Sequence, residues 1–300
     1  MTPKGNGQGG EAAPLPSADE PLAPKLYLNG FPKSGLHLLW CWSLPFVQGP
    51  AWVPRPWAGS FQGFAWTTKW SDTDELFARL DKLRPGTYLK AHTGHREDIE
   101  QKLWDNGIAH VFVYRDLRDV AVSQVYHILN AKRELDENGH ILFHPGAEQI
   151  REHLDDNFDE ILGAVIAGFG PWAGLIERWE LYAGWLKSTW TLSLRYEDMR
   201  HKAFDTAQLV IRYVYGRTAR AAGLKLTFFQ EDLNKATEYL LKVADDARPY
   251  SPTFRKGKTG GWKEHFRPEH VELWRKHDPT DWVTRLGYEW DNLTDELVSW

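Results

Sequence analysis

Cysteine is almost absent from this chain, since Cys41 is the single one among 300 residues. One cysteine excludes an intramolecular disulfide framework and a metal site built from several thiolates, so we expect a reducing, cytosolic setting. The chain also lacks an apolar run of the ~20 residues that a membrane-spanning helix needs. The nearest candidate, residues 36–47, is shorter and contains Pro45. We therefore expect no membrane span.

An excess of positive charge is missing as well. The formal net charge of −5 excludes a global basic field, so we expect no nucleic-acid partner and an anion site only where the chain builds one locally. Hydrophobic residues make up 42% of the chain, which is typical of a globular protein with a substantial core. Residues 1–24 differ, because they hold five prolines and four glycines without an apolar core. We expect a disordered tail there, not a signal peptide, and a single domain over 25–300.

One stretch organises the rest of the chain: Lys25-Leu-Tyr-Leu-Asn-Gly-Phe-Pro-Lys-Ser-Gly-Leu-His-Leu-Leu-Trp40. Its apolar residues 26–28 predict a strand, residues 29–35 a tight loop, and the apolar segment that follows a helix. Such a loop directs backbone N–H groups and the positive end of a helix dipole at a bound anion, and Lys33 adds a full charge. The expected ligand is a phosphate or a sulfate.

This loop departs from the phosphate loop of ATPases and GTPases. Gly30 and Gly35 have the spacing of that motif, but Leu36 and His37 follow where the motif has Lys and Ser or Thr. The hydroxyl that would hold magnesium is therefore missing. The loop favours a phosphate-bearing ligand that arrives without a metal ion, although an ordinary Pro/Gly turn with a solvated lysine is the alternative.

Strands and helices are predicted to alternate along the chain. Further strands are expected at 87–92, 110–115 and 191–197, and helices at 72–83, 99–106, 120–129, 172–190, 204–215 and 225–250. This order indicates an α/β fold with a central parallel β-sheet flanked by helices. Ligands of such folds bind beyond the carboxyl ends of the strands.

Charged and polar residues stand at two of these strand ends. Lys90 and His92 share one face of the second strand, and Arg115 ends the third strand before Ser123 in the next helix. A structural histidine is the alternative for His92. For Arg115 the alternative is an ion pair with a neighbouring aspartate, Asp116 or Asp119.

A basic segment follows at residues 254–266, where four cations and three glycines occur together. Trp262 and Phe266 give it apolar anchor points, so we expect a loop that clamps an anion. A disordered basic linker is the alternative.

Together these segments resemble, in the same order, the cytosolic-type sulfotransferases that use 3′-phosphoadenosine 5′-phosphosulfate (PAPS). The matching segments are Phe31-Pro-Lys-Ser-Gly35 (5′-phosphosulfate loop), Lys90-Ala-His92 (strand end), Tyr114-Arg-Asp-Leu-Arg-Asp-Val-Ala-Val-Ser123 (3′-phosphate segment), Tyr196-Glu-Asp-Met199 (near adenine) and Arg255-Lys-Gly-Lys-Thr-Gly-Gly-Trp-Lys-Glu-His-Phe266 (closing loop). Their joint occurrence is far more specific than any single motif.

The resemblance implies the P-loop-like sulfotransferase fold and an enzyme that moves a sulfuryl group from PAPS, without a metal ion, to a hydroxyl or amine of a small acceptor. The tryptophan-rich residues 41–71 favour an aromatic or hydrophobic acceptor. It implies that His92 is the general base, with His95 and His37 next in line, that Lys33 contacts the phosphosulfate bridge, and that Lys90 supports the same site. The donor-binding residues it implies are Lys33, Ser34, Gly35, Leu36, His37, Arg115, Ser123, Tyr196, Arg255, Lys256 and Gly257.

The chain also departs from the family pattern. Leu36 and His37 replace two threonines, and Leu38 stands where a tryptophan stacks on adenine. Trp40 points about 200° around the helix from Leu38 and cannot simply substitute for it. The family's dimer motif is not evident at residues 266–270, so that dimer is not predicted. Three other functions stay open: a carbohydrate sulfotransferase, a P-loop-type nucleotide kinase and a non-catalytic nucleotide-binding protein.

Overall fold

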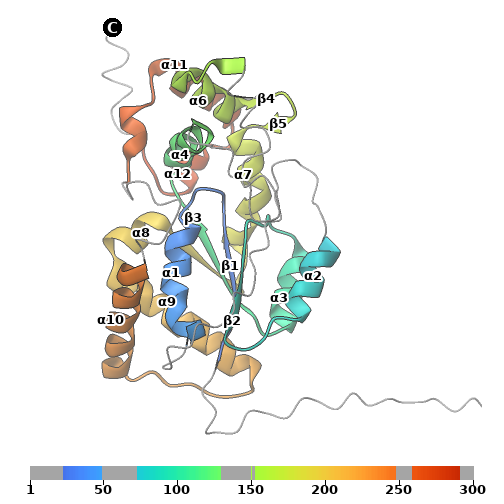
Figure 1. Ribbon diagram of the computed structural model, residues 1–300, viewed down its shortest axis with the longest axis vertical. Helices are drawn as coiled ribbons and strands as arrows, with labels where there is room; N and C mark the ends of the chain where they lie inside the picture. Colours follow the sequence, from blue (N-terminus) through green and yellow to red (C-terminus); the bar gives the residue numbers. More distant parts are fainter. Residues whose placement is uncertain (1–22, 49–72, 130–149, 151–152, 248–258, 291–300) are drawn as a thin grey trace, which may run out of the picture.

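The computed structural model describes residues 23–48, 73–129, 150, 153–247 and 259–290, which form a sheet with helices around it (Figure 1). The strands are β1 (Lys25–Gly30), β2 (Thr87–Ala91), β3 (Ala109–Tyr114), β4 (Gly168–Phe169), β5 (Trp172–Ala173) and β6 (Thr191–Arg195). The helices are α1 (Leu36–Gln48), α2 (Thr73–Asp81), α3 (Glu97–Asp105), α4 (Leu117–Leu129), α6 (Phe158–Ala167), α7 (Leu175–Ala183), α8 (Tyr196–His201), α9 (Ala203–Ala221), α10 (Gln230–Ala247), α11 (Pro268–His277) and α12 (Trp282–Arg285), with 3-10 turns η1 (Gly184–Lys187) and η3 (Gly261–Glu264).

The central sheet has the strand order β2-β1-β3-β6, and all three of its pairings are parallel. Parallel strands need a crossover connection, and helices supply it between successive strands of this central sheet. The predicted α/β fold with a central parallel sheet flanked by helices is confirmed.

Alternating side chains of the strands serve two separate cores. Leu26 and Leu28 of β1 lie in the core shared with α1, α9 and α10, whereas Tyr27 between them lies in the core shared with α2, α3, α4, α6 and α7. Because neighbouring side chains of a strand point to opposite faces, both faces of the sheet are buried. This double burial explains why the strands are nearly continuous apolar runs in the sequence.

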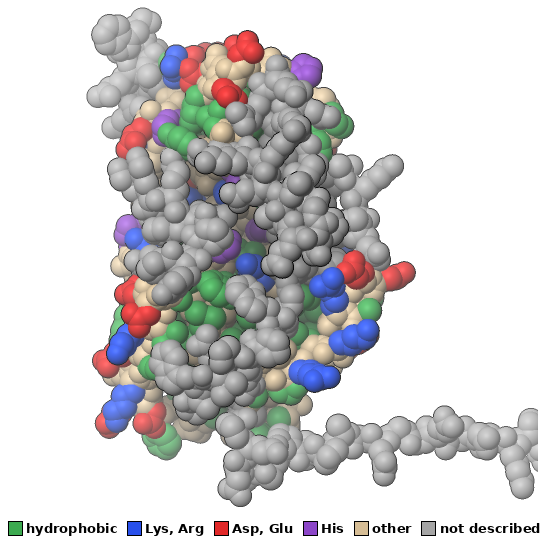
Figure 2. Space-filling model, viewed as in Figure 1, with side chains coloured by type: hydrophobic (Ala, Val, Ile, Leu, Met, Phe, Trp, Pro, Cys, Tyr) green, Lys and Arg blue, Asp and Glu red, His purple; other side chains and the backbone are tan. Residues whose placement is uncertain are grey.

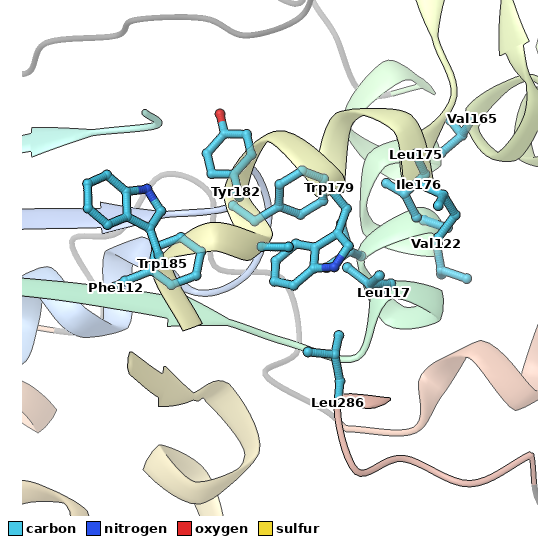
Figure 3. Close-up of a cluster of buried hydrophobic side chains, with 14 of the residues drawn as sticks. Phe112, Leu117, Val122, Val165, Leu175, Ile176, Trp179, Tyr182, Trp185 and Leu286 are labelled. Carbon is cyan, nitrogen blue, oxygen red and sulfur yellow. The ribbon is translucent and has the colours of Figure 1, made fainter. Parts of the chain in front are cut away.

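Aromatic rings of the second core support the loop after β1. Phe31, the first residue of that loop, is buried and packs edge to face against Trp179 at 5.4 Å and Tyr182 at 5.1 Å between ring centroids. Figure 3 shows these α7 side chains beside Trp185 and Phe112 in the buried cluster. The loop therefore starts from a rigid apolar base.

The prediction of one continuous helix over residues 172–190 is wrong in its bounds, because α7 covers only part of that range. Trp172 and Ala173 form β5, which pairs with β4, and the helix α7 begins only after Gly174, whose backbone is extended. At Gly184 the chain changes to a 3-10 turn. Only glycine fits at this position, because a Cβ atom would overlap the ring of His95. Local apolar periodicity could not show either tertiary contact.

Helix α6 was not predicted, although its signal is present. Asn157 caps it by accepting hydrogen bonds from the N–H groups of Asp159 at 3.1 Å and Glu160 at 3.4 Å. Its buried residues, Ile161, Leu162, Val165 and Ile166, have helical spacing. Helix α4 also begins at Leu117, three residues before the predicted start. Within the described residues, none of the helices combines the length and the apolar character needed to cross a membrane.

Candidate functional site

The carboxyl ends of the four parallel strands lie at one edge of the sheet, and predicted site residues follow each end. These residues are the loop 31–35 after β1, His92 after β2, Arg115 after β3 and Tyr196 after β6. The registers keep the ends level, because Gly30 pairs with Val113 and Tyr114 pairs with Arg195. Four segments that are distant in the sequence therefore converge where ligands of parallel sheets bind.

The loop after β1 has an unusual backbone. Lys33 has φ 71° and Gly35 has φ 106°, a region that costs residues with a Cβ atom roughly 1–2 kcal/mol. The Ser34 hydroxyl lies 2.6 Å from the carbonyl oxygen of Phe31 and 2.8 Å from that of Val113, and shares its hydrogen between them. Ser34 therefore ties the loop to itself and to β3.

Tyr196 lies directly against this loop. A Cβ atom at Gly35 would overlap the Tyr196 ring, so only glycine allows this close approach. The guanidinium carbon of Arg115 lies 4.7 Å from the centre of the same ring. The ring thus joins the loop after β1 to the end of β3.

His92 is held in one tautomer. Its Nδ1 atom lies 2.7 Å from the carbonyl oxygen of Gly30. A carbonyl only accepts, so Nδ1 must carry the hydrogen and donate it. The lone pair is then on Nε2, which can accept a proton from a substrate.

The backbone around His92 is fixed from several sides. Asn29 is fully buried, and its side chain donates to the Thr93 carbonyl at 2.8 Å and accepts from the Thr93 N–H at 2.9 Å. The Tyr182 hydroxyl donates to the His92 carbonyl at 3.1 Å, and Trp185 Nε1 donates to the Thr93 carbonyl at 2.9 Å. The aromatic core therefore positions this histidine through its main chain.

Three histidines and two lysines influence one another electrostatically at this edge. Burial, together with the charges of Lys90, Lys33 and His92, lowers the pKa of His37 to about 3. For His92, burial and the two lysine charges outweigh the bond to the Gly30 carbonyl and lower the pKa to about 4. Burial and the charges of Lys33 and His92 also lower the pKa of His127 to about 4. At neutral pH these imidazoles are therefore in their neutral form.

Lys90 lies at the α1 side of this group. Burial lowers the pKa of its amine, and its Nζ atom is 5.9 Å from the centre of the Trp40 ring. Trp40 in turn donates to the Tyr88 hydroxyl at 2.9 Å. Histidine and Lys or Arg side chains gather in the middle of the face shown in Figure 2. Positive charge and neutral bases are thus combined within an acidic protein.

At the end of β3, Arg115 forms an ion pair with Asp119 at 3.1 Å, as the alternative interpretation of this residue predicted. The pair lies at the start of α4, and Ser123 follows Asp119 by about one helical turn on the same face. An ion pair at this place does not prevent Arg115 from binding an anion, since a guanidinium has five N–H donors.

Sequence reasoning missed two residues of this site. Asn29 was treated only as part of a loop, although a buried amide between two strand ends has a positioning role. His127 was overlooked, although it follows Ser123 by four residues and therefore shares its helix face. Helical spacing from a residue already singled out could have revealed His127.

The predicted residues Arg255, Lys256 and Gly257 lie outside the described residues. The apolar anchor of the same segment is confirmed, because Trp262 and Phe266 are buried in the second core with ring centroids 5.6 Å apart. Among the described residues, no group of three His, Cys, Asp or Glu side chains is placed to hold a metal ion.

The chain is similar to known proteins over most of its length. Residues 24–278 match the family model of the sulfotransferase domain. Sulfotransferase 1E1 of Cavia porcellus is 24% identical over 209 residues, which cover 66% of this chain and 62% of that protein. Sulfotransferase 1E1 of Homo sapiens is 25% identical over 206 residues, which cover 66% of this chain and 63% of that protein. The chain thus spans less than two thirds of the length of these relatives.

A solved structure is similar in fold. Mouse sulfotransferase SULT7A1, crystallised in complex with PAP, superposes with a TM-score of 0.50 and 15% identity, and the match covers 88% of this chain and 87% of that chain. At this identity the likeness concerns the fold alone. It agrees with the P-loop-like fold expected from the strand, loop and helix around Lys33.

Proposed function

The chain belongs to the sulfotransferase family, and from this premise we propose that it transfers a sulfuryl group from PAPS to a hydroxyl, or an amine, of a small acceptor. One observation carries the proposal. The loop with Lys33, the oriented His92, and Arg115 stacked on Tyr196 converge at one sheet edge, although they come from four separate segments. Such a constellation provides anion contacts and a base side by side.

The residues present fit a nucleotide that carries phosphate at both ends. Leu36 and His37 start α1 directly after Gly35, and the first N–H groups of a helix have no partner within it. Arg115, just before α4, and Ser123, in its second turn, would hold the 3′-phosphate, and Tyr196 would face the adenine. Ser34 would act by shaping the loop. Arg255, Lys256 and Gly257 stay predictions for the 3′-phosphate.

His92 would act as the general base. Its Nδ1 hydrogen is committed to the Gly30 carbonyl, so Nε2 is the atom that would take the proton of the acceptor hydroxyl. Since the pKa of His92 is lowered to about 4, the base is in its neutral form at physiological pH. A positioned base of this kind typically contributes ~10²–10⁴-fold to the rate.

Lys33 and Lys90 would supply fixed positive charge. PAPS, when bound, supplies the sulfuryl group and a phosphate leaving group that gains negative charge. Both lysines act electrostatically on His92 and His37, which supports their position around one point. Cations fixed before the reaction stabilise charge that develops in the transition state.

The acceptor side is less defined than the donor side. His127 shares the electrostatic environment of Lys33 and His92, so a polar group of the acceptor could contact it. An aromatic or hydrophobic acceptor, or a carbohydrate, is expected from the tryptophan-rich residues 41–71, of which 49–71 lie outside the described residues. We expect a small molecule of one of these classes.

Calorimetric titration tests this function most directly. The protein should bind 3′-phosphoadenosine 5′-phosphate (PAP) without metal more tightly than it binds ATP with magnesium, because Leu36 and His37 replace the residues that a magnesium-nucleotide loop needs. A preference for ATP with magnesium would favour a kinase. Tight PAP binding without transfer of sulfate to any member of an acceptor panel would indicate a non-catalytic protein.

A further inference from the structure

Asp119 is a buried carboxylate in the first turn of α4 with partners far away in the sequence. Its side chain is 2% exposed. Oδ2 accepts from Arg115 Nη2 at 3.1 Å and from the Gly260 N–H at 2.9 Å, and Oδ1 accepts from the Trp262 N–H at 2.9 Å. Both carboxylate oxygens are thus used to join the end of β3 to the start of η3.

These bonds fix the residues around Arg115. The same guanidinium lies over the Tyr196 ring, which packs against Gly35. Contacts therefore run without interruption from η3 through Asp119 and Arg115 to the loop that contains Lys33. Hydrogen bonds with an ionised partner are shorter and stronger than neutral ones, so the carboxylate can hold this arrangement in place.

A purely local role does not explain these contacts. An acidic residue in the first turn of a helix gains roughly 0.3–1 kcal/mol from the helix dipole, and an exposed side chain suffices for that. Asp119 is instead buried and accepts three hydrogen bonds from groups outside α4. A negative charge beside an anion site would also repel the ligand unless it improved the site in another way.

We propose that Asp119 is a positioning residue of the donor site, which orients Arg115 toward the 3′-phosphate of the nucleotide and fixes the turn at Gly260–Trp262 beside it. This inference rests on the proposed function, because Arg115 receives its phosphate role there. It links Asp119 to the 3′-phosphate of the ligand. Replacing Asp119 should therefore lower the affinity for nucleotides with a 3′-phosphate and leave the affinity for other nucleotides unchanged.

Asp119→Asn is the substitution that tests this role. It keeps the size of the side chain, but its NH₂ group would face the guanidinium or a backbone N–H, where both sides are donors. We expect the affinity for PAP to fall about 10- to 100-fold, the range for losing hydrogen bonds with a charged partner. The affinity for adenosine 5′-monophosphate, which lacks the 3′-phosphate, should stay within about 2-fold.

Asp278→Asn is the control. Asp278 is also a buried carboxylate that accepts N–H bonds, from Trp282 at 2.9 Å and from Trp274 Nε1 at 3.1 Å. Its replacement should lower thermal stability and leave the ratio of the two affinities unchanged. Asp119→Glu keeps the charge and serves as the second variant if Asp119→Asn does not fold; it should lose part of the preference for PAP.

Isothermal titration with both nucleotides separates the outcomes. If the wild-type protein prefers PAP to adenosine 5′-monophosphate and both Asp119→Asn and Asp119→Glu keep that preference, the role of Asp119 is overturned and the proposed function stands. The same conclusion follows if the variants lose affinity for both nucleotides equally. A wild-type protein without any preference for PAP overturns the proposed function and this assignment together.

Discussion

The imidazole of His92 is oriented by one hydrogen bond. The Gly30 carbonyl takes the Nδ1 hydrogen at 2.7 Å, and the backbone around the residue is fixed by Asn29, Tyr182 and Trp185. One imidazole nitrogen is therefore committed to structure and the other stays available as a base. His95, one of the two other candidates, differs in this respect: its Nε2 atom lies 2.9 Å from Glu100, and its ring packs against Trp185.

His92→Ala is expected to lower turnover by about 10²- to 10⁴-fold, because the transition state then lacks its base. PAP affinity should change little, since the proton transfer occurs on the acceptor side. Steady-state kinetics with PAPS and calorimetry with PAP measure the two effects. His95→Ala is the control, and it should affect stability more than turnover. If His92→Ala keeps its turnover while His95→Ala loses it, the base has been assigned to the wrong histidine.

At the scale of elements, the loop between β1 and α1 combines backbone strain with charge. Lys33 has φ 71° in a segment whose neighbours, Phe31 and Ser34, are buried and hydrogen-bonded. A residue with a Cβ atom persists in such a conformation only where its surroundings determine it. This backbone conformation places the charged Lys33 just before α1, at a position where glycine would adopt the same φ without steric cost.

Two variants separate the backbone of this loop from its charge. Lys33→Ala and Lys33→Gly both remove the ammonium group, so both should lose turnover with PAPS. Lys33→Gly should be the more stable of the two by up to about 1 kcal/mol in urea unfolding, because glycine adopts a positive φ without steric cost. Equal stabilities would argue against strain at Lys33, and turnover near the wild-type value in either variant would remove Lys33 from the mechanism.

Helix α4 shows how one element gathers several functions. Asp119, Ser123 and His127 follow one another at intervals of four residues, which places them along one face. The first connects to η3, and the last lies within electrostatic reach of Lys33 and His92. A single helix thus runs from the expected 3′-phosphate site to the expected acceptor site.

For the whole molecule, buried histidines make stability depend on pH. His110 of β3 is 2% exposed, and its Nδ1 atom lies 2.9 Å from the Thr191 hydroxyl. Burial, aided by the charge of His95, lowers its pKa from 6.5 to about 3. Between these values the unfolded chain binds a proton that the folded chain does not. The part of the folding stability that depends on neutral His110 is therefore fully present above about pH 6.5 and is lost as the pH falls toward 3.

His110→Phe should reduce this acid sensitivity. At pH 5 the proton taken up by an unfolded histidine disfavours folding by about 2 kcal/mol, so the variant should lose about that much less stability between pH 7 and pH 5. Urea unfolding at the two pH values measures the difference. Thr191→Val removes the hydrogen-bond partner and keeps the titrating ring, so it should retain the wild-type pH dependence. An unchanged slope in His110→Phe would show that other groups cause the acid sensitivity.

Local order in the chain was enough to predict the fold. The alternation of apolar runs with helical periodicity gave the four parallel strands, and the segments around Lys33, His92, Arg115 and Tyr196 could be assigned to their ends. These features depend on neighbouring residues, which a sequence displays directly. The helix predicted over 172–190 shows the limit, because Trp172 and Ala173 pair with β4 instead, and local periodicity does not show the close approach of Gly184 to the His95 ring.

The sequence by itself determined which residues are candidates for the proposed nucleotide site, and the tertiary structure decided what surrounds them. The hydrogen bond that sets the tautomer of His92 comes from a residue 62 positions away. Two of the three partners of Asp119 are 141 and 143 positions away, and His127 lies within electrostatic reach of Lys33 and His92, which belong to other segments of the chain. Contacts between distant segments depend on the packing of the whole chain, and no local pattern of residues encodes them.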